Sequence, residues 1–561
     1  MVDPFIQAPP SLGNQYDEDH ALRALLERLL PENSRAPIET ELRQMGALAG
    51  GELHALQLED REAEPILRHW DPWGNRVDAI EHTAVWRRAE QIASTHGVVA
   101  TAYEGRHGAL SRVHQFALAY LFAPCTDVFA CPLAMTDGMA RSLIASGNEA
   151  LRDAVLPHLM SRDPATFWTS GQWMTEAIGG SDVGLSEAIA REEGGQWRLY
   201  GRKWFTSAAS SQVALTLARP EGNPPGGRGL ALFFVRCHDD AGRLQGIQLN
   251  RLKEKLGTRK LPTAELELLG TPAIPVMGLE NGVRNITPML NITRTWNAVV
   301  AASAMRRAIA LSRDYARRRH AFGAELIDKP LHVDTLAAMQ AELEGALQLT
   351  FFVVQLLGRA EHGELDTPTE RLLRLLTPIA KLTTGKQAVA VTSEALECFG
   401  GAGYVEDTGI AGLLRDAQVL PIWEGTTNVL SLDVLRALSR EGGLEELGAL
   451  LEAIQEEALD PGLKKAARVA TKALERAIEW LEEAQKAGPA EVEAGARRFA
   501  LTLGRATELG LLVRQAQWSL AHASDRRPRA AALRFAQTAI DQIAWCDREE
   551  AGLLAREVGE M

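Results

Sequence analysis

The feature that most constrains the fold is a change of periodicity in the middle of the chain. From about residue 21 to 160, segments such as "EHTAVWRRAEQIAS" repeat apolar residues every three or four positions, which is the spacing of amphipathic helices. Between about 165 and 275 they give way to short β-rich runs such as "GLALFFVRC", separated by Gly, Asn and Pro. Long helical patterns return after about residue 283. Because helices and strands are segregated and do not alternate, the sequence predicts an α+β protein.

The length of the chain implies several domains. Its 561 residues exceed what one hydrophobic core usually holds. Four long amphipathic patterns after the β-rich region predict a helix bundle. We therefore expect four domains: a helical N-terminal domain with an irregular arm (1–164), a β domain (165–280), a helix bundle (281–440) and an extra helical domain (441–561).

Composition narrows the class of protein. The net charge of -13 disfavours general binding to nucleic acid or anionic membranes. Five scattered cysteines without a CxxC pair favour a reducing compartment, and the 13 histidines form no ligand-like cluster, so we expect no metal. No basic segment followed by an apolar run opens the chain, and no apolar stretch approaches the ~18 residues of a membrane span. These features predict a cytoplasmic protein without a membrane span.

Five stretches carry residues suited to chemistry, and each also has an ordinary structural explanation. They are "QWMTEAIGGSDVG", "GRKWFTSAAS", "RRRHAFG", "LECFGGAGYVED" and "LPIWEGTTNV". Taken singly and in this order, they could be a polar loop, a half-buried strand, a solvated helix end, a helix C-cap and a Glu near a helix N-terminus. The last gains ~0.3–1 kcal/mol from the helix dipole. Alternatively, glycines beside hydroxyls suit phosphate, arginines bind phosphate bidentately, and glycines admit a closely approaching ligand. Motifs of P-loop, Rossmann, zinc-peptidase and esterase type are absent from the sequence.

Taken together and in order, these five stretches resemble the acyl-CoA dehydrogenase family over about residues 165–440. The long N-terminal part and the extra helical C-terminus are similar to the branch that contains the AidB-like, alkylation-response proteins and long-chain relatives. The resemblance implies an N-terminal helical domain, a central β-barrel, a C-terminal four-helix bundle and an additional C-terminal helical domain. It also implies a homotetramer in which FAD is shared across subunits.

The resemblance assigns roles residue by residue. Glu424 matches the catalytic base, and Ile422, Trp423 and Gly425 give it apolar neighbours, which make a carboxylate a stronger base. Contacts to FAD are implied for Met174, Thr175, Gly180, Ser181, Trp204, Thr206, Arg319, Gly400, Gly401, Thr426 and Asn428. Thr206 would lie near flavin N5, and Arg319 would reach the FAD of a neighbouring subunit. Contacts to the acyl-CoA substrate are implied for Ser181, Arg294 and Gly425.

The implied reaction is α,β-desaturation of an acyl-CoA thioester, a step of fatty acid metabolism. The base removes an α proton while a hydride passes to flavin N5, and an electron-transfer flavoprotein takes the electrons. Two alternatives stay open. One is an AidB-like flavoprotein that binds DNA through its C-terminal domain, where arginines gather between 497 and 534, although residues 441–561 hold more acidic than basic residues. The other is a non-catalytic protein that binds long-chain acyl-CoA.

Overall fold

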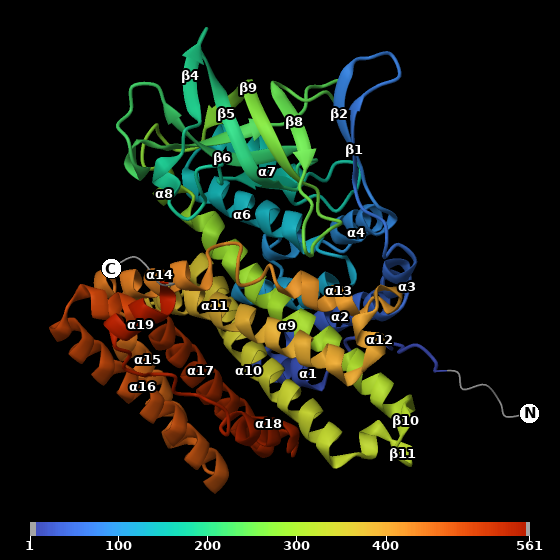
Figure 1. Cartoon of the computed structure of the whole chain (residues 1–561), viewed down its shortest axis with the longest axis vertical. Helices are drawn as coiled ribbons and strands as arrows, with labels where there is room; N and C mark the ends of the chain where they lie inside the picture. Colours follow the sequence, from blue (N-terminus) through green and yellow to red (C-terminus); the bar gives the residue numbers. More distant parts are fainter. Residues whose placement is uncertain (1–6, 557–561) are drawn as a thin grey trace, which may run out of the picture.

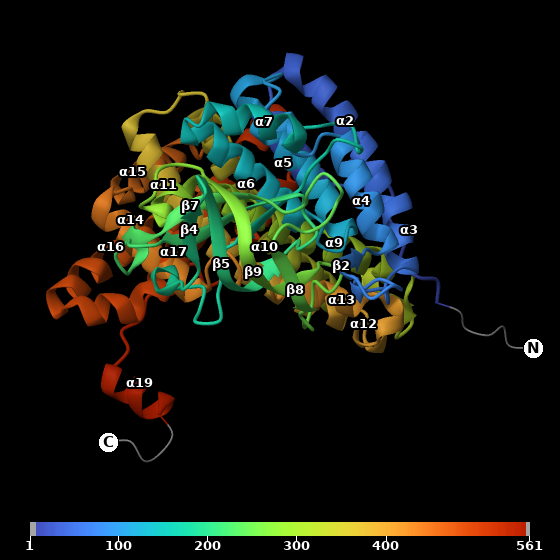
Figure 2. The same cartoon turned by 90° about the horizontal axis from the view of Figure 1, so that it is seen from above.

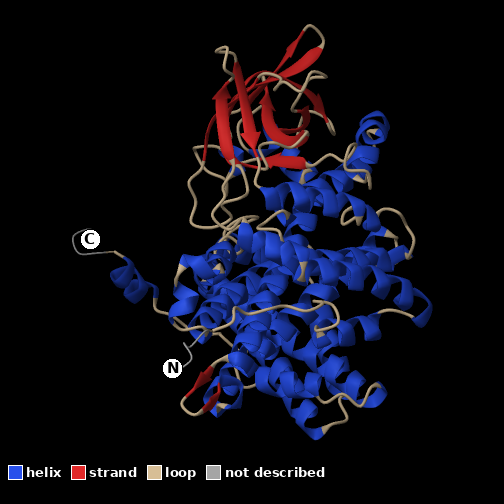
Figure 3. Cartoon of the chain, turned by 90° about the vertical axis from the view of Figure 1, so that its right-hand side faces the viewer, coloured by secondary structure: helices blue, strands red, loops and turns tan. Residues whose placement is uncertain are grey.

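The computed structural model describes residues 7–556. Most of its strands gather in one block at one end of the molecule, and helices make up most of the rest (Figures 1 and 3). The segregation of helices and strands predicted from the sequence is therefore confirmed. No helix in the described part of the chain combines the length and apolar character needed to cross a bilayer.

The N-terminal region is mainly helical. After an arm without regular structure from residue 7, its helices are α1 (His20–Leu29), α2 (Glu32–Gly50), α3 (Glu52–Glu59), α4 (Ala84–Thr95), α5 (Ser111–Phe122), α6 (Ala130–Ser146) and α7 (Glu149–Leu159). The two strands of a hairpin, β1 (Ile66–Trp70) and β2 (Arg76–Glu81), interrupt them. This hairpin was missed in the sequence. Its residues are mostly exposed, so the strands lack the clear apolar alternation by which a half-buried strand is recognised.

The β domain is a closed sheet. Its strands are β3 (Ser170–Trp173), β4 (Ile189–Glu193), β5 (Gln196–Ser207), β6 (Val213–Pro220), β7 (Ala231–Arg236), β8 (Ile247–Leu252) and β9 (Thr263–Pro275). Pairing runs β6-β4-β5-β9-β7 and returns from β7 to β6, which closes the barrel that the family resemblance implied. Alternate residues of β6, β7 and β9 fill its interior, where they form a core of their own.

Three long helices form the body of the bundle. They are α9 (Thr287–Arg318), α10 (Pro330–Glu361) and α11 (Thr367–Cys398), each of 32 residues. The shorter elements beside them are α8 (Gly282–Asn285), β10 (His320–Ala321), β11 (Ala324–Glu325), α12 (Gly401–Tyr404), α13 (Ile410–Ala417) and α14 (Thr427–Arg440). The fourth bundle helix, α14, has 14 residues and packs against α11.

The extra C-terminal region is not an independent unit. Its helices are α15 (Leu444–Glu457), α16 (Pro461–Ala487), α17 (Pro489–His522), α18 (Arg527–Phe535) and α19 (Arg548–Ala555). The first four share one apolar core with α10, α11 and α14, whereas α19 projects from the body (Figure 2). The N-terminal region also touches this region, because Arg28 of α1 donates hydrogen bonds to Gln515 of α17 and to Gln348 of α10. Helix α1 near the start of the chain and helix α17 near its end thus both contact the bundle.

Candidate active site

Glu424 lies on a strained turn between α13 and α14. Its backbone is left-handed, with φ of +57°, and Gly425 follows with φ of +99°. A non-glycine residue pays roughly 1–2 kcal/mol for this conformation, which surrounding contacts must offset. Thr426 then caps α14, because its hydroxyl accepts a hydrogen bond from the N–H of Val429 at 3.3 Å. The turn therefore presents a carboxylate from a fixed position just before a helix start.

Two side chains from the long helices hold this turn. The hydroxyl of Thr293 on α9 donates to Glu424 Oε2 at 2.6 Å. The amine of Lys381 on α11 donates to the carbonyl of Gly425 at 2.6 Å. The backbone N–H of Glu424 makes no hydrogen bond with any other described residue. Thr293 thus orients the carboxylate, and Lys381 anchors the Gly425 carbonyl. Because the N–H of Glu424 has no partner among the described residues, it remains available to a ligand.

Lys381 is unusual because it is buried beside a carboxylate without pairing directly with it. Its side chain is 0% exposed. Burial lowers the pKa of Lys381 to about 7, with Glu424 opposing that shift and Arg294 adding to it. An amine of this kind titrates near neutral pH and senses the charge on Glu424.

The barrel side of the site joins two of the predicted motifs. The N–H of Trp204 on β5 donates to the carbonyl of Thr175 at 2.9 Å. A fully buried ion pair below them, between Lys203 and Glu176 at 2.6 Å, ties the loop after β3 to the barrel. Glu176 also accepts hydrogen bonds from the backbone where that loop returns toward β4. The loop carrying Met174, Thr175 and Gly180 is therefore fixed against the end of β5.

Thr206 on β5 is the buried polar residue on this side that is suited to meet a ligand. It is fully buried, and its hydroxyl makes no hydrogen bond in the described structure. Burial does not simply alternate along this part of β5, because the pairing of β5 with β9 shifts register between Lys203 and Thr206. Lys203 and Thr206 are buried, whereas Phe205 is 52% exposed. An orphaned buried hydroxyl calls for a partner that the chain does not supply.

A cavity of about 430 Å³ opens beside Arg294. Asp433 accepts from Arg294 at 2.8 Å and from Arg374 at 2.9 Å. Burial alone would raise the pKa of Asp433, but these two guanidinium groups hold it below its ordinary value. The arginines lining the cavity are Arg228, Arg284, Arg294, Arg374, Arg436 and Arg440. One carboxylate against six guanidinium groups makes this cavity strongly attractive to anions.

Not all the predicted residues gather around Glu424. Arg319 ends α9 beside the β10–β11 hairpin, which lies at the far side of the helical body from the barrel (Figure 1). Gly400 and Gly401 lie at the same end of the bundle. Tyr315, four residues before Arg319, contacts Phe399, which directly precedes Gly400, with ring centroids 4.8 Å apart. This second group presents exposed aromatic side chains, with Phe322 95% and Tyr404 88% exposed.

Several other predicted residues lie on open surface. The exposed set comprises Gly180, Ser181, Thr426, Asn428, Gly400 and Gly401. Ile422 is 59% exposed, so the apolar enclosure expected around Glu424 is incomplete on that side, while Trp423 packs against the core. In the described residues no cluster of three His, Cys, Asp or Glu side chains could hold a metal.

Sequence reasoning missed Thr293, Lys381 and Asp433. Thr293 directly precedes the assigned Arg294, so its place on the same helix turn was within reach. Lys381 is a lone charge in the apolar run "TPIAKLTT", which is a usable signal for a buried functional amine. Asp433 resembles any helical acid until Arg294 and Arg374 are known to converge on it.

Family models match all four regions of the chain. Four family models match the chain: the adaptive response protein AidB N-terminal domain (7–164), the acyl-CoA dehydrogenase middle domain (171–270), the acyl-CoA dehydrogenase C-terminal domain (280–439) and the acyl-CoA dehydrogenase 11 C-terminal domain-like family (446–551). The chain belongs to the acyl-CoA dehydrogenase family, whose members are FAD-dependent oxidoreductases.

Individual relatives are similar over most of their length. Acyl-CoA dehydrogenase family member 11 of Caenorhabditis elegans is 42% identical over 93% of this chain and 87% of its own. The putative acyl-CoA dehydrogenase AidB of Escherichia coli is 35% identical over 68% of this chain and 71% of its own.

Solved structures give the same result. The crystal structure of C. elegans ACDH-11 in complex with C11-CoA superposes with a TM-score of 0.93 at 40% identity, covering 97% of this chain and 94% of that one. The Bd2924 apo-form gives 0.85 at 44% identity, covering 91% and 99%. The four-part architecture is thus shared along its full extent, including the extra C-terminal helices.

Proposed function

We propose that this protein is an FAD-dependent dehydrogenase that desaturates acyl-CoA thioesters between the α and β carbons. The observation that carries the proposal is the held turn at Glu424. Thr293 aims the carboxylate, Lys381 anchors the next peptide, and the free N–H of Glu424 can donate to an oxygen. A base and an N–H donor on one residue suit removal of a proton next to a carbonyl.

The chain's residues divide the work as follows. Glu424 takes the α proton, and its backbone N–H stabilises the negative charge that develops on the thioester oxygen, an effect of roughly 3–4 kcal/mol per donor. Bound FAD would supply the acceptor for the hydride from the β carbon, so that loss of the α proton to Glu424 and of this hydride would leave a carbon–carbon double bond. Thr293 holds the carboxylate in reach of the substrate, and Lys381 binds the carbonyl of the Gly425–Thr426 peptide, which holds the strained turn in place.

The residues present fit FAD. The orphaned Thr206 hydroxyl and the Thr175–Trp204 junction offer hydrogen-bonding groups and an aromatic face for a flavin. Met174, Gly180 and Ser181 would continue this surface toward the diphosphate, and Thr426 and Asn428 would meet the ADP half. Gly400 and Gly401 leave open space, since a side chain added at either would meet no atom within 4 Å.

We assign Arg319, Gly400 and Gly401 to the FAD of a neighbouring subunit. Their place beside the β10–β11 hairpin is far from the Thr206 surface of the same chain (Figure 1). The exposed rings of Phe322 and Tyr404 fit burial between subunits. A homotetramer and transfer of electrons to an electron-transfer flavoprotein complete the proposal.

The arginine-lined cavity is assigned to the phosphates of coenzyme A. It begins at Arg294, one residue after the threonine that holds Glu424, and extends toward Arg436 and Arg440. Guanidinium groups bind phosphate in bidentate fashion, and their convergence matches a ligand with several phosphates. The acyl thioester would then enter with its charged end held here and its reactive carbons beside Glu424.

The test is anaerobic mixing of the FAD-loaded enzyme with a panel of acyl-CoAs. We expect the parent to bleach its flavin and Glu424→Gln to retain FAD and ligand binding without bleaching. Glu394→Gln, an exposed change on α11, serves as the matched control. If Glu424→Gln bleached as fast as the parent, Glu424 would not be the base. If no acyl-CoA bleached the parent although several bound, the protein would be an acyl-CoA carrier.

The DNA-binding alternative has less support from the structure. The arginines that make residues 497–534 look basic are largely engaged within the chain. Arg505 pairs with Glu342, Arg529 with Asp460 at 3.0 Å and Arg534 with Asp334 at 2.8 Å. Arg514 lies over Phe352. Binding to duplex DNA at low salt would restore that alternative.

A further inference from the structure

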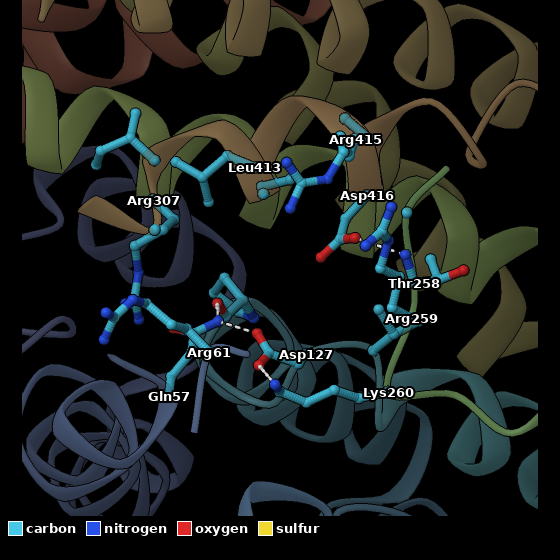
Figure 4. Close-up of a pocket in the computed structure, with 18 of the residues that line it drawn as sticks. Gln57, Arg61, Asp127, Thr258, Arg259, Lys260, Arg307, Leu413, Arg415 and Asp416 are labelled. Carbon is cyan, nitrogen blue, oxygen red and sulfur yellow. Dashed lines mark hydrogen bonds and ion pairs between the residues drawn. The ribbon is translucent and has the colours of Figure 1, made fainter. Parts of the chain in front are cut away.

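The molecule has a large cavity that the proposed reaction does not use. Its volume is about 440 Å³, and it lies between the N-terminal region, the loop of residues 257–260, α9 and α13 (Figure 4). Part of its lining is apolar, with Val128, Val300, Ala304, Leu413 and Trp423 among the residues that form it. A cavity of this size and mixed character suits an organic ligand with an apolar body and a polar end.

The cavity continues one face of the helix that positions Glu424. Thr293, Asn297, Val300, Ala304, Arg307 and Leu311 are spaced by four, three, four, three and four residues along α9. Residues with this spacing share a helix face. Thr293 holds Glu424, and the indole N–H of Trp423 donates to Asn297. The remaining four line the cavity.

Trp423 therefore separates the reaction site from the cavity. It neighbours Glu424 in sequence and forms part of the cavity wall. From Thr293 to Arg307 the helix rises roughly 21 Å, at about 1.5 Å per residue over fourteen positions. A long acyl chain that starts at Glu424 and follows this face passes the Trp423–Asn297 pair and enters the cavity.

Arg307 is a buried cation at one end of the cavity. Its relative exposure is 2%, and it donates to His54 Nδ1 at 3.1 Å and to the carbonyl of Ala49 at 3.0 Å. Among residues 7–556 its Nε has no hydrogen-bond partner and no carboxylate forms an ion pair with it. Burial lowers the pKa of Arg307, and Cys125 and Asp127 only partly oppose that shift. Burial lowers the pKa of His54 to about 4, so this imidazole is neutral at pH 7 and brings no balancing charge.

The other cations that line the cavity have carboxylate partners. Lys260 lies 3.5 Å from Asp127, which Gln57 also contacts. Asp416 accepts from the N–H of Thr258 at 2.6 Å, on the wall across the cavity from Arg307 (Figure 4). Arg259 and Arg415 pair with Glu64 and Glu406. A buried guanidinium without a carboxylate partner is costly unless a ligand supplies the anion.

We propose that this cavity receives the far end of a long acyl chain and that Arg307 binds a carboxylate at that end. The favoured ligand class is thus the CoA half-thioester of a long-chain dicarboxylic acid. This inference rests on the proposed function only for the placement of the thioester at Glu424. The contact between Arg307 and a terminal carboxylate is a matter of binding and does not depend on turnover.

The test measures binding to FAD-loaded Glu424→Gln, which avoids turnover. Hexadecanoyl-CoA is compared with the CoA thioester of hexadecanedioic acid by titration calorimetry. A hydrogen-bonded charge pair is worth enough to favour the dicarboxylic ligand by about ten- to a hundredfold. Adding Arg307→Met should abolish that preference, and Arg307→Lys should retain part of it. Arg313→Met, a change on the same helix at a residue that bonds Gln340 outside the cavity, should leave it intact.

A second variant keeps the test decisive if Arg307→Met fails to fold. Ala304→Phe fills the cavity and should weaken binding of both sixteen-carbon ligands without affecting butyryl-CoA. The role of Arg307 is overturned if the Glu424→Gln protein that retains Arg307 binds the two long ligands equally. It is also overturned if the preference survives Arg307→Met. Unchanged long-chain binding by Ala304→Phe overturns the path. If the dicarboxylic ligand binds selectively but no acyl-CoA bleaches the flavin of the parent protein, the proposed reaction is rejected. This inference, which concerns binding, then still holds.

Discussion

Replacing Lys381 with Met tests whether a nearly neutral amine anchors the catalytic turn. In the folded protein burial lowers the pKa of Lys381 from 10.5 to about 7, and each unit of difference corresponds to about 1.4 kcal/mol. In the unfolded chain the Lys381 amine stays protonated up to about pH 10.5, whereas in the folded chain it loses its proton near pH 7. The free energy of unfolding therefore rises with pH between about 7 and 10.5. Below pH 7 the buried amine is charged, and its burial destabilises the folded protein by roughly 5 kcal/mol.

Lys381→Met removes this titration, so the parent should gain stability relative to the variant by about 2–3 kcal/mol between pH 6 and pH 9. Urea unfolding of the FAD-loaded proteins, followed by tryptophan fluorescence across that range, measures the difference. Lys386→Met is the control, since Lys386 lies on the same helix but is exposed, and its difference from the parent should stay flat. A flat difference for Lys381→Met as well would refute the reasoning, because the amine would then be charged in both states.

Three further changes follow from contacts around the site and the bundle. Thr293→Val removes the hydroxyl that donates to Glu424 and should slow flavin reduction about ten- to a hundredfold, while Thr293→Ser preserves the rate. Gly180→Ala brings a methyl group to 2.6 Å from the Thr175 hydroxyl and should increase FAD loss on dialysis, measured by absorbance. Burial raises the pKa of Glu508 to about 8, so native stability falls as pH rises from about 4.5 to 8. Glu508→Gln should cancel up to about 4 kcal/mol of that fall in urea titrations between pH 5 and 8.

The order of helical and β regions was predictable because both periodicities are strong and long. Patterns of apolar residues mark α9, α10 and α11, and short buried runs mark β6 and β7. The β1–β2 hairpin escaped because its strands are short and exposed on most positions. Strand β3 escaped because its four residues, Ser170–Trp173, offer too little pattern to separate from the loop that follows.

The site was predictable as a set of motifs but not as a geometry. Glu424 could be singled out, yet its turn is held by Thr293, 131 positions from Glu424, and by Lys381, 44 positions from Gly425. Pairings across such separations leave no local pattern in one sequence. The buried Arg307 was likewise invisible, because an arginine on a long helix ordinarily snorkels to solvent.

The contact of Arg28 with Gln515 bears on how the protein is made. These residues are separated by 487 positions, and at roughly 5–20 residues per second a ribosome needs about 25–100 s to join them. Throughout that interval Arg28 of α1 lacks its partner on α17, while Leu22, Leu25 and Leu26 of the same helix belong to the core that the N-terminal region shares with the bundle. A messenger truncated before α17 would therefore yield a product that lacks the Arg28–Gln515 contact near its beginning as well as the helices at its end.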